Sequence, residues 1–368
     1  MQSNHDYSYD PQTYACPEGW QVYQQCVCTP VPCATQWPCA VTGSTGPAGS
    51  VESPCSQPAY ACAVNQEDGT LCVIDPVTHK ITGRIAVGGA PRGLAADPGL
   101  RRLYVTDTDS GTLRIIDANT GEVTAPVPVG AGAGFPAVNT NNRLIYVPVA
   151  DGGSVAAVNG FNGRVICHVS VGGAPVSAAV NPRTNLVYIA NGTDSVPVVN
   201  SNTNTVFARI RLPDGLKARD AACDPCGNNV YILCGDGSVV LVCGTGGTAE
   251  RVIRPAQGAS ALALDQGLGL LYLASGSRVL VYDMCKFRQV GALPLGNPPA
   301  AQPRRIAVNS VTHLVYVTDA NGFIYIADGG TNTQVAALPG GAQPYDIAVL
   351  NCEAPCPPCG NNRCGDQH

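Results

Sequence analysis

Charged side chains are scarce in this chain of 368 residues. Asp, Glu, Lys and Arg together make up 13% of it, about half of their usual share in soluble domains. Lysine occurs only at Lys80, Lys217 and Lys286, and the formal net charge is −5. A protein that follows a nucleic-acid backbone needs a basic patch or stripe, and the sequence shows none. We therefore expect no nucleic-acid partner.

Long hydrophobic runs are also missing. The sequence contains no stretch of about 18 apolar residues, the length that a membrane-spanning helix needs, so we expect no membrane insertion. No apolar run is long enough, or periodic enough at 3.6 residues, to predict a helix. Residues 1–7 lack the basic start and the apolar segment of a secretory signal.

What the chain does contain is a repeat, which is marked by tyrosine. Seven tyrosines follow one another at intervals of 41 to 44 residues: Tyr60, Tyr104, Tyr146, Tyr188, Tyr231, Tyr272 and Tyr316. A period near forty is typical of a radial or solenoid array. Each unit has four short apolar runs, rich in Val, Ile and Tyr and separated by Gly, Asn, Asp and Pro. Such runs predict β-strands.

The two ends of the array distinguish a closed ring from a solenoid. An alanine marks the first run of each unit, at Ala95, Ala137, Ala179, Ala222, Ala263, Ala307 and Ala348. Tyr60 lies upstream of all of them, so the first unit begins at its second strand. Residues 347–350 would return to supply the missing innermost strand. The sequence therefore predicts an all-β fold, a seven-bladed β-propeller with four-stranded blades, over residues 59–351.

The repeat also resembles a known family. The segments LYVTD at 103–107, VYIAN at 187–191 and VYVTD at 315–319 are similar to the YVTN-type propeller repeat. The resemblance covers roughly residues 59–351. It implies a seven-bladed propeller of a kind often found on prokaryotic cell surfaces. It implies no catalytic residues, because the family pattern marks strands and turns.

Two segments outside the array share none of its pattern. Residues 1–58 form an arm rich in Cys and Pro, with too few aliphatic side chains to build a core. Residues 352–368 form a Cys-rich tail. Within the arm, residues 43–49 have glycine at every third position. We interpret this stretch as a flexible linker, although it also resembles, weakly, the collagen-like tracts of spore-surface proteins.

Cysteine is unusually abundant, with 18 residues. Such a density predicts disulfides in an oxidising compartment, which conflicts with the missing secretory signal. Release by another route, deposition on a spore surface by the mother cell, and a cytosolic metal protein remain as explanations. The candidates for disulfide formation are Cys16, Cys26, Cys28, Cys33, Cys39, Cys55, Cys62, Cys72, Cys223, Cys226, Cys352, Cys356, Cys359 and Cys364.

Ring closure leads to one expected pairing. Because the first and last strands of the array belong to one blade, the segments just outside them emerge close together. We therefore expect Cys55 to pair with Cys352, Cys356 or Cys359.

A second pairing is expected within the first hairpin. If Val64 lies opposite Thr70, Cys62 lies opposite Cys72, and the two could form a cross-strand disulfide. A slip of one residue in the register would separate them.

Metal or cofactor chemistry has less support than disulfides. The tail spacing over residues 352–364, together with the Cys223-x2-Cys226 pair, could hold zinc, but paired knuckles of regular spacing are absent. We predict no cofactor, no metal and no catalytic residue. The loops at 87–91, 129–133 and 171–175, which lead to the central channel, consist almost entirely of Gly, Ala and Pro with a leading Val, and such side chains neither move protons nor bind ions.

The remaining charged residues have simple structural interpretations. The doublets Arg101-Arg102 and Arg304-Arg305 are expected to be solvated or paired with carboxylates. Aspartates near hairpin tips are expected to form turns, with calcium binding at one or two as a minority interpretation. These aspartates are Asp107, Asp109, Asp151, Asp194, Asp236 and Asp319.

The Cys-rich flanks then decide between functions. We expect a non-enzymatic structural protein that assembles with copies of itself, through its arm and disulfides, into an extracellular or spore-surface filament or layer. The arm would add a strand to a neighbouring blade or dock on its face, and a head-to-tail contact that does not close makes a fibre. The alternative is a surface recognition or adhesion propeller that binds a glycan or protein. An enzyme that uses the propeller face is the least favoured.

Overall fold

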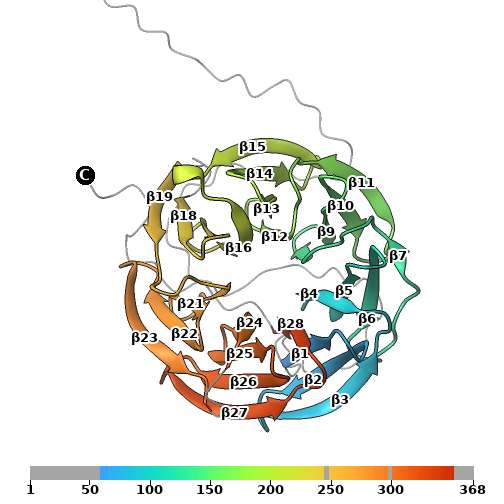
Figure 1. The fold of residues 1–368 in the computed structure, drawn as a ribbon. Helices are drawn as coiled ribbons and strands as arrows, with labels where there is room; N and C mark the ends of the chain where they lie inside the picture. The colour runs from blue at the N-terminus through green and yellow to red at the C-terminus, as the bar shows by residue number, and fades with distance from the viewer. Residues whose placement is uncertain (1–58, 244–247, 297–300, 352–368) are drawn as a thin grey trace, which may run out of the picture. The chain divides into compact units, whose positions relative to one another are not determined.

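The computed structural model describes residues 59–243, 248–296 and 301–351. They form seven four-stranded antiparallel sheets, arranged as blades around a central axis (Figure 1). The prediction of an all-β, seven-bladed propeller is therefore confirmed. In the described part of the chain, no helix has the length and apolar character needed to cross a membrane.

Each blade runs from an innermost strand at the axis to an outermost strand at the rim. Blade 1 has β28 (Pro344–Leu350), β1 (Tyr60–Asn65), β2 (Thr70–Asp75) and β3 (Lys80–Ala86) in this order. Blade 2 has β4 (Pro91–Asp97), β5 (Arg102–Asp107), β6 (Thr112–Asp117) and β7 (Val127–Pro128). Blade 3 has β8 (Ala137–Asn139), β9 (Leu144–Val149), β10 (Ser154–Asn159) and β11 (Val165–Ser170).

The other four blades follow the same order. Blade 4 has β12 (Ser177–Asn181), β13 (Leu186–Ala190), β14 (Ser195–Asn200) and β15 (Thr205–Arg211). Blade 5 has β16 (Ala218–Asp224), β17 (Asn229–Cys234), β18 (Val239–Cys243) and β19 (Thr248–Ile253), after the short 3₁₀ turn η1 (Pro213–Gly215). Blade 6 has β20 (Ala261–Asp265), β21 (Leu270–Ser275), β22 (Arg278–Asp283) and β23 (Arg288–Pro294). Blade 7 has β24 (Pro303–Asn309), β25 (Leu314–Asp319), β26 (Phe323–Asp328) and β27 (Thr333–Pro339).

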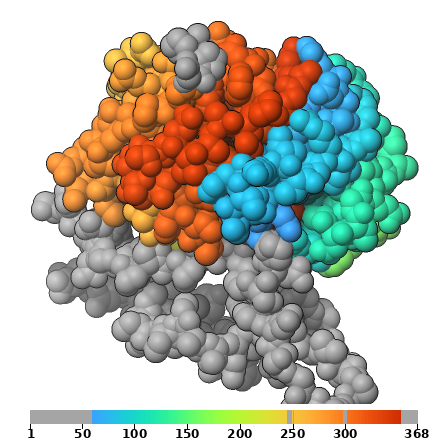
Figure 2. All heavy atoms as spheres, turned by 90° about the horizontal axis from the view of Figure 1, so that it is seen from below, coloured from blue at the N-terminus to red at the C-terminus, as the bar shows by residue number. Residues whose placement is uncertain are grey.

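Blade 1 closes the ring by joining the two ends of the array. Its innermost strand β28 pairs antiparallel with β1, with Tyr60 opposite Leu350 and Ala63 opposite Ile347. This confirms the predicted closure by the C-terminal strand. Figure 2 shows the outer strands of blades 7 and 1 lying directly against each other at this point. The first and last blades therefore pack as neighbours.

The repeat tyrosines lie between blades. Six of them are at most 1% exposed, and each pairs with the alanine that marks the innermost strand, as Tyr104 does with Ala95. The hydroxyl group of Tyr104 donates to the carbonyl oxygen of Gly160 in the next blade at 3.2 Å. The ring thus fills the space between two sheets, and the spacing of the repeat reflects this packing.

The seventh position differs from the sequence interpretation. Tyr60 pairs with Leu350 and is only half-buried. Cys62 is the residue that lies opposite the repeat alanine Ala348, and it is 1% exposed. A cysteine therefore takes the tyrosine position in blade 1, and Tyr60 lies two residues before it.

The expected disulfide between Cys62 and Cys72 is wrong. In the β1–β2 hairpin Cys62 lies opposite Val73, and Cys72 lies opposite Ala63. The hairpin turn has four residues, 66–69, where the sequence interpretation assumed five. Because side chains alternate along a strand, the slip of one residue places the two thiols on opposite faces of the sheet. Both are buried free cysteines.

The other cysteine predictions have mixed outcomes. Cys223 is a free cysteine, and burial raises the pKa of its thiol. Cys226 and Cys243 are disulfide-bonded. The expected pairing of Cys55 with the tail lies outside the described residues, as do the candidates Cys16, Cys26, Cys28, Cys33, Cys39, Cys352, Cys356, Cys359 and Cys364.

A matched pair of substitutions tests the inter-blade packing. Tyr146 donates from its buried hydroxyl group to Oδ1 of Asn204 at 2.7 Å. The buried hydroxyl group of Tyr316 has no hydrogen-bond partner. We expect Tyr146→Phe to lower the free energy of unfolding by about 1 kcal/mol, because the hydrogen bond is lost. Tyr316→Phe should change it by less than about 0.5 kcal/mol. Urea denaturation measures both, and equal losses would contradict this account.

Candidate functional site

The innermost strands of four blades carry a β-bulge close to their start. In each of them the pairing with the second strand skips one residue, which is left without a partner in the ladder. The skipped residues are Tyr345 in blade 1, Arg92 in blade 2, Arg219 in blade 5 and Arg304 in blade 7. A bulge bends the strand locally and re-aims the side chain of the extra residue. All four of these side chains line one cavity at the axis of the ring.

This hub cavity has a volume of about 320 Å³. Every blade contributes to its wall, because the lining residues lie at the start of the innermost strands or directly before them. They are Arg92, Phe135, Val176, Arg219, Asp220, Ser260, Pro303, Arg304, Arg305 and Tyr345. Four arginines and two aromatic rings thus face the axis of a chain that has few charged residues.

Arg305 of blade 7 contacts residues of two other blades at the hub. Its guanidinium group forms an ion pair with Asp220 of blade 5, and its side chain is only 16% exposed. The guanidinium carbon lies 3.5 Å from the centroid of the Phe135 ring of blade 3. Asp220 accepts a further hydrogen bond from the hydroxyl group of Ser177 at 2.5 Å. The charges of Arg305 and Asp220 therefore largely satisfy each other.

A second buried carboxylate, Asp346, lies on the blade 1 side of the hub. Its oxygens accept hydrogen bonds from the backbone amides of Leu94 at 2.8 Å and Ile347 at 2.9 Å. Burial raises the pKa of Asp346 to about 6, although Arg305 and these amides act to lower it. The protonation state of the hub therefore changes in the mildly acidic range.

The other arginines are held by an aromatic ring. The guanidinium carbons of Arg92 and Arg304 lie 4.8 and 4.9 Å from the centroid of the Tyr345 ring. Arg92 also donates from Nη2 to the Tyr345 hydroxyl oxygen at 2.6 Å. The rings of Tyr345 and Phe135 are nearly parallel, at 12°, with centroids 6.2 Å apart. Cation–π contacts of this kind orient guanidinium groups without neutralising them.

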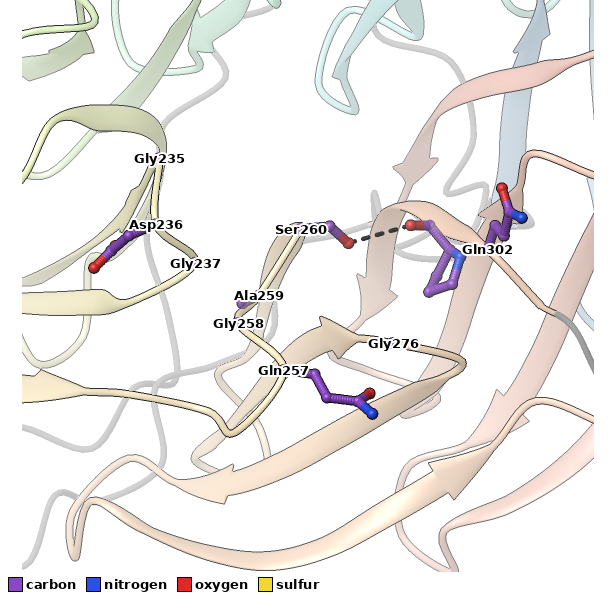
Figure 3. Close-up of a pocket in the computed structure, with 10 residues that line it drawn as sticks. Gly235, Asp236, Gly237, Gln257, Gly258, Ala259, Ser260, Gly276 and Gln302 are labelled. Carbon is purple, nitrogen blue, oxygen red and sulfur yellow. Dashed lines mark hydrogen bonds between the residues drawn. The ribbon is translucent and has the colours of Figure 1, made fainter.

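A second pocket, of about 410 Å³, lies beside the hub and shares Ser260 and Pro303 with it. Four of its ten lining residues are glycines, and Gln257 and Gln302 add neutral polar groups (Figure 3). Figure 3 also shows the hydroxyl group of Ser260 directed at the carbonyl oxygen of Pro303, at 3.2 Å. Asp236 accepts a hydrogen bond at 2.6 Å from the hydroxyl group of Ser238 in its own hairpin. This second pocket, called the rim pocket below because it lies at the edge of the hub cavity, is therefore polar, but most of its wall is uncharged.

The sequence interpretation is correct for Arg305, but Arg304 lies over the Tyr345 ring instead, and the hub was not predicted. Arg305 is paired with a carboxylate, as expected for its doublet. The loops at 87–91, 129–133 and 171–175 are small, as expected, yet the side chains at the channel come from the residues that follow such loops. The sequence does contain a pattern that marks the hub. In most units the lining residues lie two or three positions before the repeat alanine.

The doublet Arg101-Arg102 does not line the hub cavity. Its side chains contact a turn of blade 3 and the first strand residue of blade 1. Arg102 donates from Nη1 to the carbonyl oxygens of Gly160 and Phe161, both at 2.6 Å. Arg101 lies over the ring of Tyr60 at 6.0 Å.

The turn role of the hairpin aspartates is confirmed at Asp107, Asp236 and Asp319, whereas the side chain of Asp194 pairs with Arg211. Oδ1 of Asp107 accepts from the backbone amides of Asp109 and Ser110 at 3.1 Å, and Oδ2 accepts from Ala90 at 3.1 Å. Asp319 likewise accepts from the backbone amides of Asn321 and Gln302. Within residues 59–351, outside the gaps at 244–247 and 297–300, no three His, Cys, Asp or Glu side chains gather as metal ligands would.

Removing Arg305 tests how far the hub depends on it. We expect Arg305→Met to lower the free energy of unfolding by about 3–5 kcal/mol, because Asp220 is left buried without its partner. The double variant Arg305→Met/Asp220→Asn should recover part of this loss. Arg254→Met, which removes an exposed pair with Asp214, is the control and should cost less than about 1 kcal/mol. Equal costs at Arg305 and Arg254, measured by denaturant unfolding, would contradict a buried hub pair.

The raised pKa of Asp346 predicts a pH dependence of stability. Its folded-state pKa of about 6 lies above the ordinary value of 3.8, so the folded state binds more protons between these values. Stability from this group is therefore full below 3.8 and is lost as the pH rises through 6. Between pH 7.5 and 5, wild type should gain about 1 kcal/mol relative to Asp346→Asn. Denaturant unfolding at both pH values checks this, and a constant difference would contradict it.

Comparisons with known proteins identify the fold. No family model matches this chain, and no curated protein matches it. A functionally unknown protein from Desulfotomaculum acetoxidans DSM 771 is similar in structure, with a TM-score of 0.68 and 14% identity over 80% of this chain and 99% of that one. The β-propeller domain of Cps50 (Swd1) from Myceliophteria thermophila has a TM-score of 0.63 and 10% identity, over 73% of this chain and 96% of that one. These similarities show a β-propeller and nothing further about activity.

Proposed function

We propose that this protein is a non-enzymatic structural component of an extracellular or spore surface, which assembles with copies of itself into a filament or layer. The observation that carries the proposal is the closure of the ring by β28 and β1, where Tyr60 lies opposite Leu350. The arm of residues 1–58 and the tail of residues 352–368 are therefore continuous with the same end of the same blade. Two Cys-rich segments that start together are suited to join one copy to the next.

The distribution of sulfur supports this proposal. Ten of the 18 cysteines lie outside the ring. Within it, Cys62, Cys72, Cys167, Cys223 and Cys234 are free thiols, and three of these are fully buried. Burial raises the pKa of Cys62 to about 12 and that of Cys234 to about 11, which keeps these thiols protonated and unreactive. Most of the sulfur available for links between copies is therefore in the two flanks.

The outer edges of the blades offer a place for such a link. The outermost strand of each blade has one hydrogen-bonded neighbour among the described strands. Along β15 and β27 the residues alternate between exposed and more buried positions, the pattern of a sheet edge that a further strand can extend. The arm of a second copy, added to one of these edges and then fixed by disulfides, would give a head-to-tail contact.

The hub supports the non-enzymatic part of the proposal. Its arginines stay protonated at any physiological pH and cannot act as general acids or bases. Asp220 is already engaged with Arg305 and Ser177, and Asp346, whose pKa burial raises to about 6, is buried and does not line the cavity. Such a set of groups is suited to holding a charged ligand.

A second candidate function is recognition, in which the ring face binds a surface glycan or protein. One observation favours it, namely that three arginines line the hub cavity without an ion-pair partner among the described residues. They are Arg92, Arg219 and Arg304.

Electrophoresis of native material tests the assembly. Without reductant we expect a ladder, or a band retained near the well, that collapses to one monomer band when disulfides are reduced. Free thiols should be blocked before denaturation so that no new bonds form. Cys167→Ser, which removes a free thiol of the ring, is the control and should leave the ladder unchanged.

Deletion of residues 1–58 separates the arm from the ring in the same experiment. The shortened chain should behave as a monomeric propeller in size-exclusion chromatography. Continued polymerisation of this variant would exclude the arm as the connector. A single compact monomer band of the full chain without reductant would exclude disulfide-linked assembly altogether.

A further inference from the structure

We propose that the hub cavity binds a tetrahedral oxyanion, a phosphate or sulfate group, through Arg92, Arg219 and Arg304. This inference rests on the second candidate function, recognition, and names the class of ligand. It is independent of the disulfide-linked assembly, because the residues that carry it lie on the innermost strands of the ring.

The first step is the charge balance at the hub. Four arginines and one carboxylate, Asp220, line the cavity, and a second carboxylate, Asp346, is buried near Arg305. Asp220 is engaged by Arg305, and Asp346 accepts two backbone hydrogen bonds. The cavity therefore carries an excess of positive charge, and a partly enclosed excess of this kind is stabilised by an anion.

The second step concerns a hydrogen-bond donor of Arg304 that has no acceptor. Nη1 of Arg304 is buried and has no hydrogen-bond partner. A buried charged donor without an acceptor is costly, and most such groups in proteins are satisfied. Arg304 itself lies on the wall of the cavity, so a rotation of its guanidinium group toward an acceptor there would satisfy Nη1.

The third step is pre-organisation. The ring of Tyr345 contacts the guanidinium groups of both Arg92 and Arg304, and its hydroxyl oxygen accepts from Arg92. Arg219 is the exposed residue of the three. Two of the binding groups are therefore already oriented before a ligand arrives, which lowers the entropy lost on binding.

The arrangement of the arginines selects the shape of the anion. They extend from blades 2, 5 and 7, so they approach the axis from different directions. A guanidinium group offers a planar pair of donors that matches two oxygens of an oxyanion. A tetrahedral group presents oxygens in several directions at once, whereas a carboxylate presents two in one plane. A cavity of about 320 Å³ is at the lower end of the usual range for ligand sites, so the group it holds is small.

The anion has two plausible sources, a free ion or an ester on a larger molecule. The rim pocket adjoins the hub cavity through Ser260 and Pro303, and Gln257 and Gln302 give it a neutral polar wall. The uncharged part of a phosphate or sulfate ester, such as a sugar, would have space there. The shared chemistry is the oxyanion, and the two sources differ in whether the rim pocket is used.

Calorimetric titration of the full-length protein tests the proposal. The probes are sodium phosphate, sodium sulfate and glucose 6-phosphate, in a zwitterionic buffer of low ionic strength at pH 7.5. We expect saturable binding at one site. Arg304→Gln and Arg219→Gln should each weaken it roughly tenfold or more, the loss typical of one charged hydrogen bond. Tighter binding of glucose 6-phosphate than of phosphate would identify an ester as the ligand, and the reverse would identify the free ion.

The control is Arg254→Gln, because Arg254 does not line the hub cavity and its exposed side chain pairs with Asp214. It should bind the probes as wild type does. Circular dichroism shows whether each variant is folded, and Arg219→Gln decides the test if Arg304→Gln is unfolded, because Arg219 is exposed. Absence of saturable binding for all three probes would overturn the proposal, as would an equal loss in Arg254→Gln.

Failure of this inference can be told apart from failure of the recognition function. A neutral oligosaccharide that bound wild type and Arg304→Gln equally well would retain recognition and exclude the anion site. If neither that probe nor any of the anions bound, both would fail. The electrophoretic ladder is measured separately and does not depend on either result.

Discussion

The pairing of β28 with β1 is the constraint on which the rest of this structure depends. It supplies blade 1 with its innermost strand, and so completes a ring in which every blade is packed between two others. It also brings Tyr345 and Asp346 to the axis, where Tyr345 contacts Arg92 across 253 positions of sequence. Without this pairing the hub would lose the aromatic ring of Tyr345, which orients Arg92 and Arg304. It would also lose the carboxylate of Asp346, which lies near Arg305. The same strand pairing thus closes the fold and positions the side chains of the hub.

Much of the fold could be predicted from the sequence because blade packing imposes a regular spacing. The buried tyrosines and the alanines opposite them recur at that spacing, and the displaced first unit indicates closure. The errors arose where the pattern gives no register. Both faces of the middle strands are buried, so there is no alternation of polar and apolar residues to set the pairing. The sequence consequently predicts a turn one residue longer than the observed turn at 66–69, and it places Tyr60 where the structure has Cys62.

The hub could not be predicted in the same way. Its ion pair joins Arg305 to Asp220, which are 85 positions apart, and no local motif connects them. The bulges that direct Arg92, Arg219 and Arg304 to the cavity depend on which residues of two strands are paired, and a single sequence does not show this. The glycine-rich loops carry no charged side chains, and the residues that line the cavity lie at or just before the strand starts that follow such loops. The position of the lining residues relative to the repeat alanine was visible, but its meaning required the ring.

The direction of β28 gives the ring two chemically different faces. The strand begins near the hub cavity, at Pro344 and Tyr345, and ends at Leu350 beside Tyr60. Seven residues of extended chain span about 20 Å, so the start of β28 at the cavity and its end beside Tyr60 lie on opposite faces of the ring. Copies tethered at the second face, as the proposed assembly requires, would keep the first face accessible to solvent. An array built in that way would present many identical pockets on one side, and a polymer carrying several matching groups would bind it with avidity far above that of any single pocket.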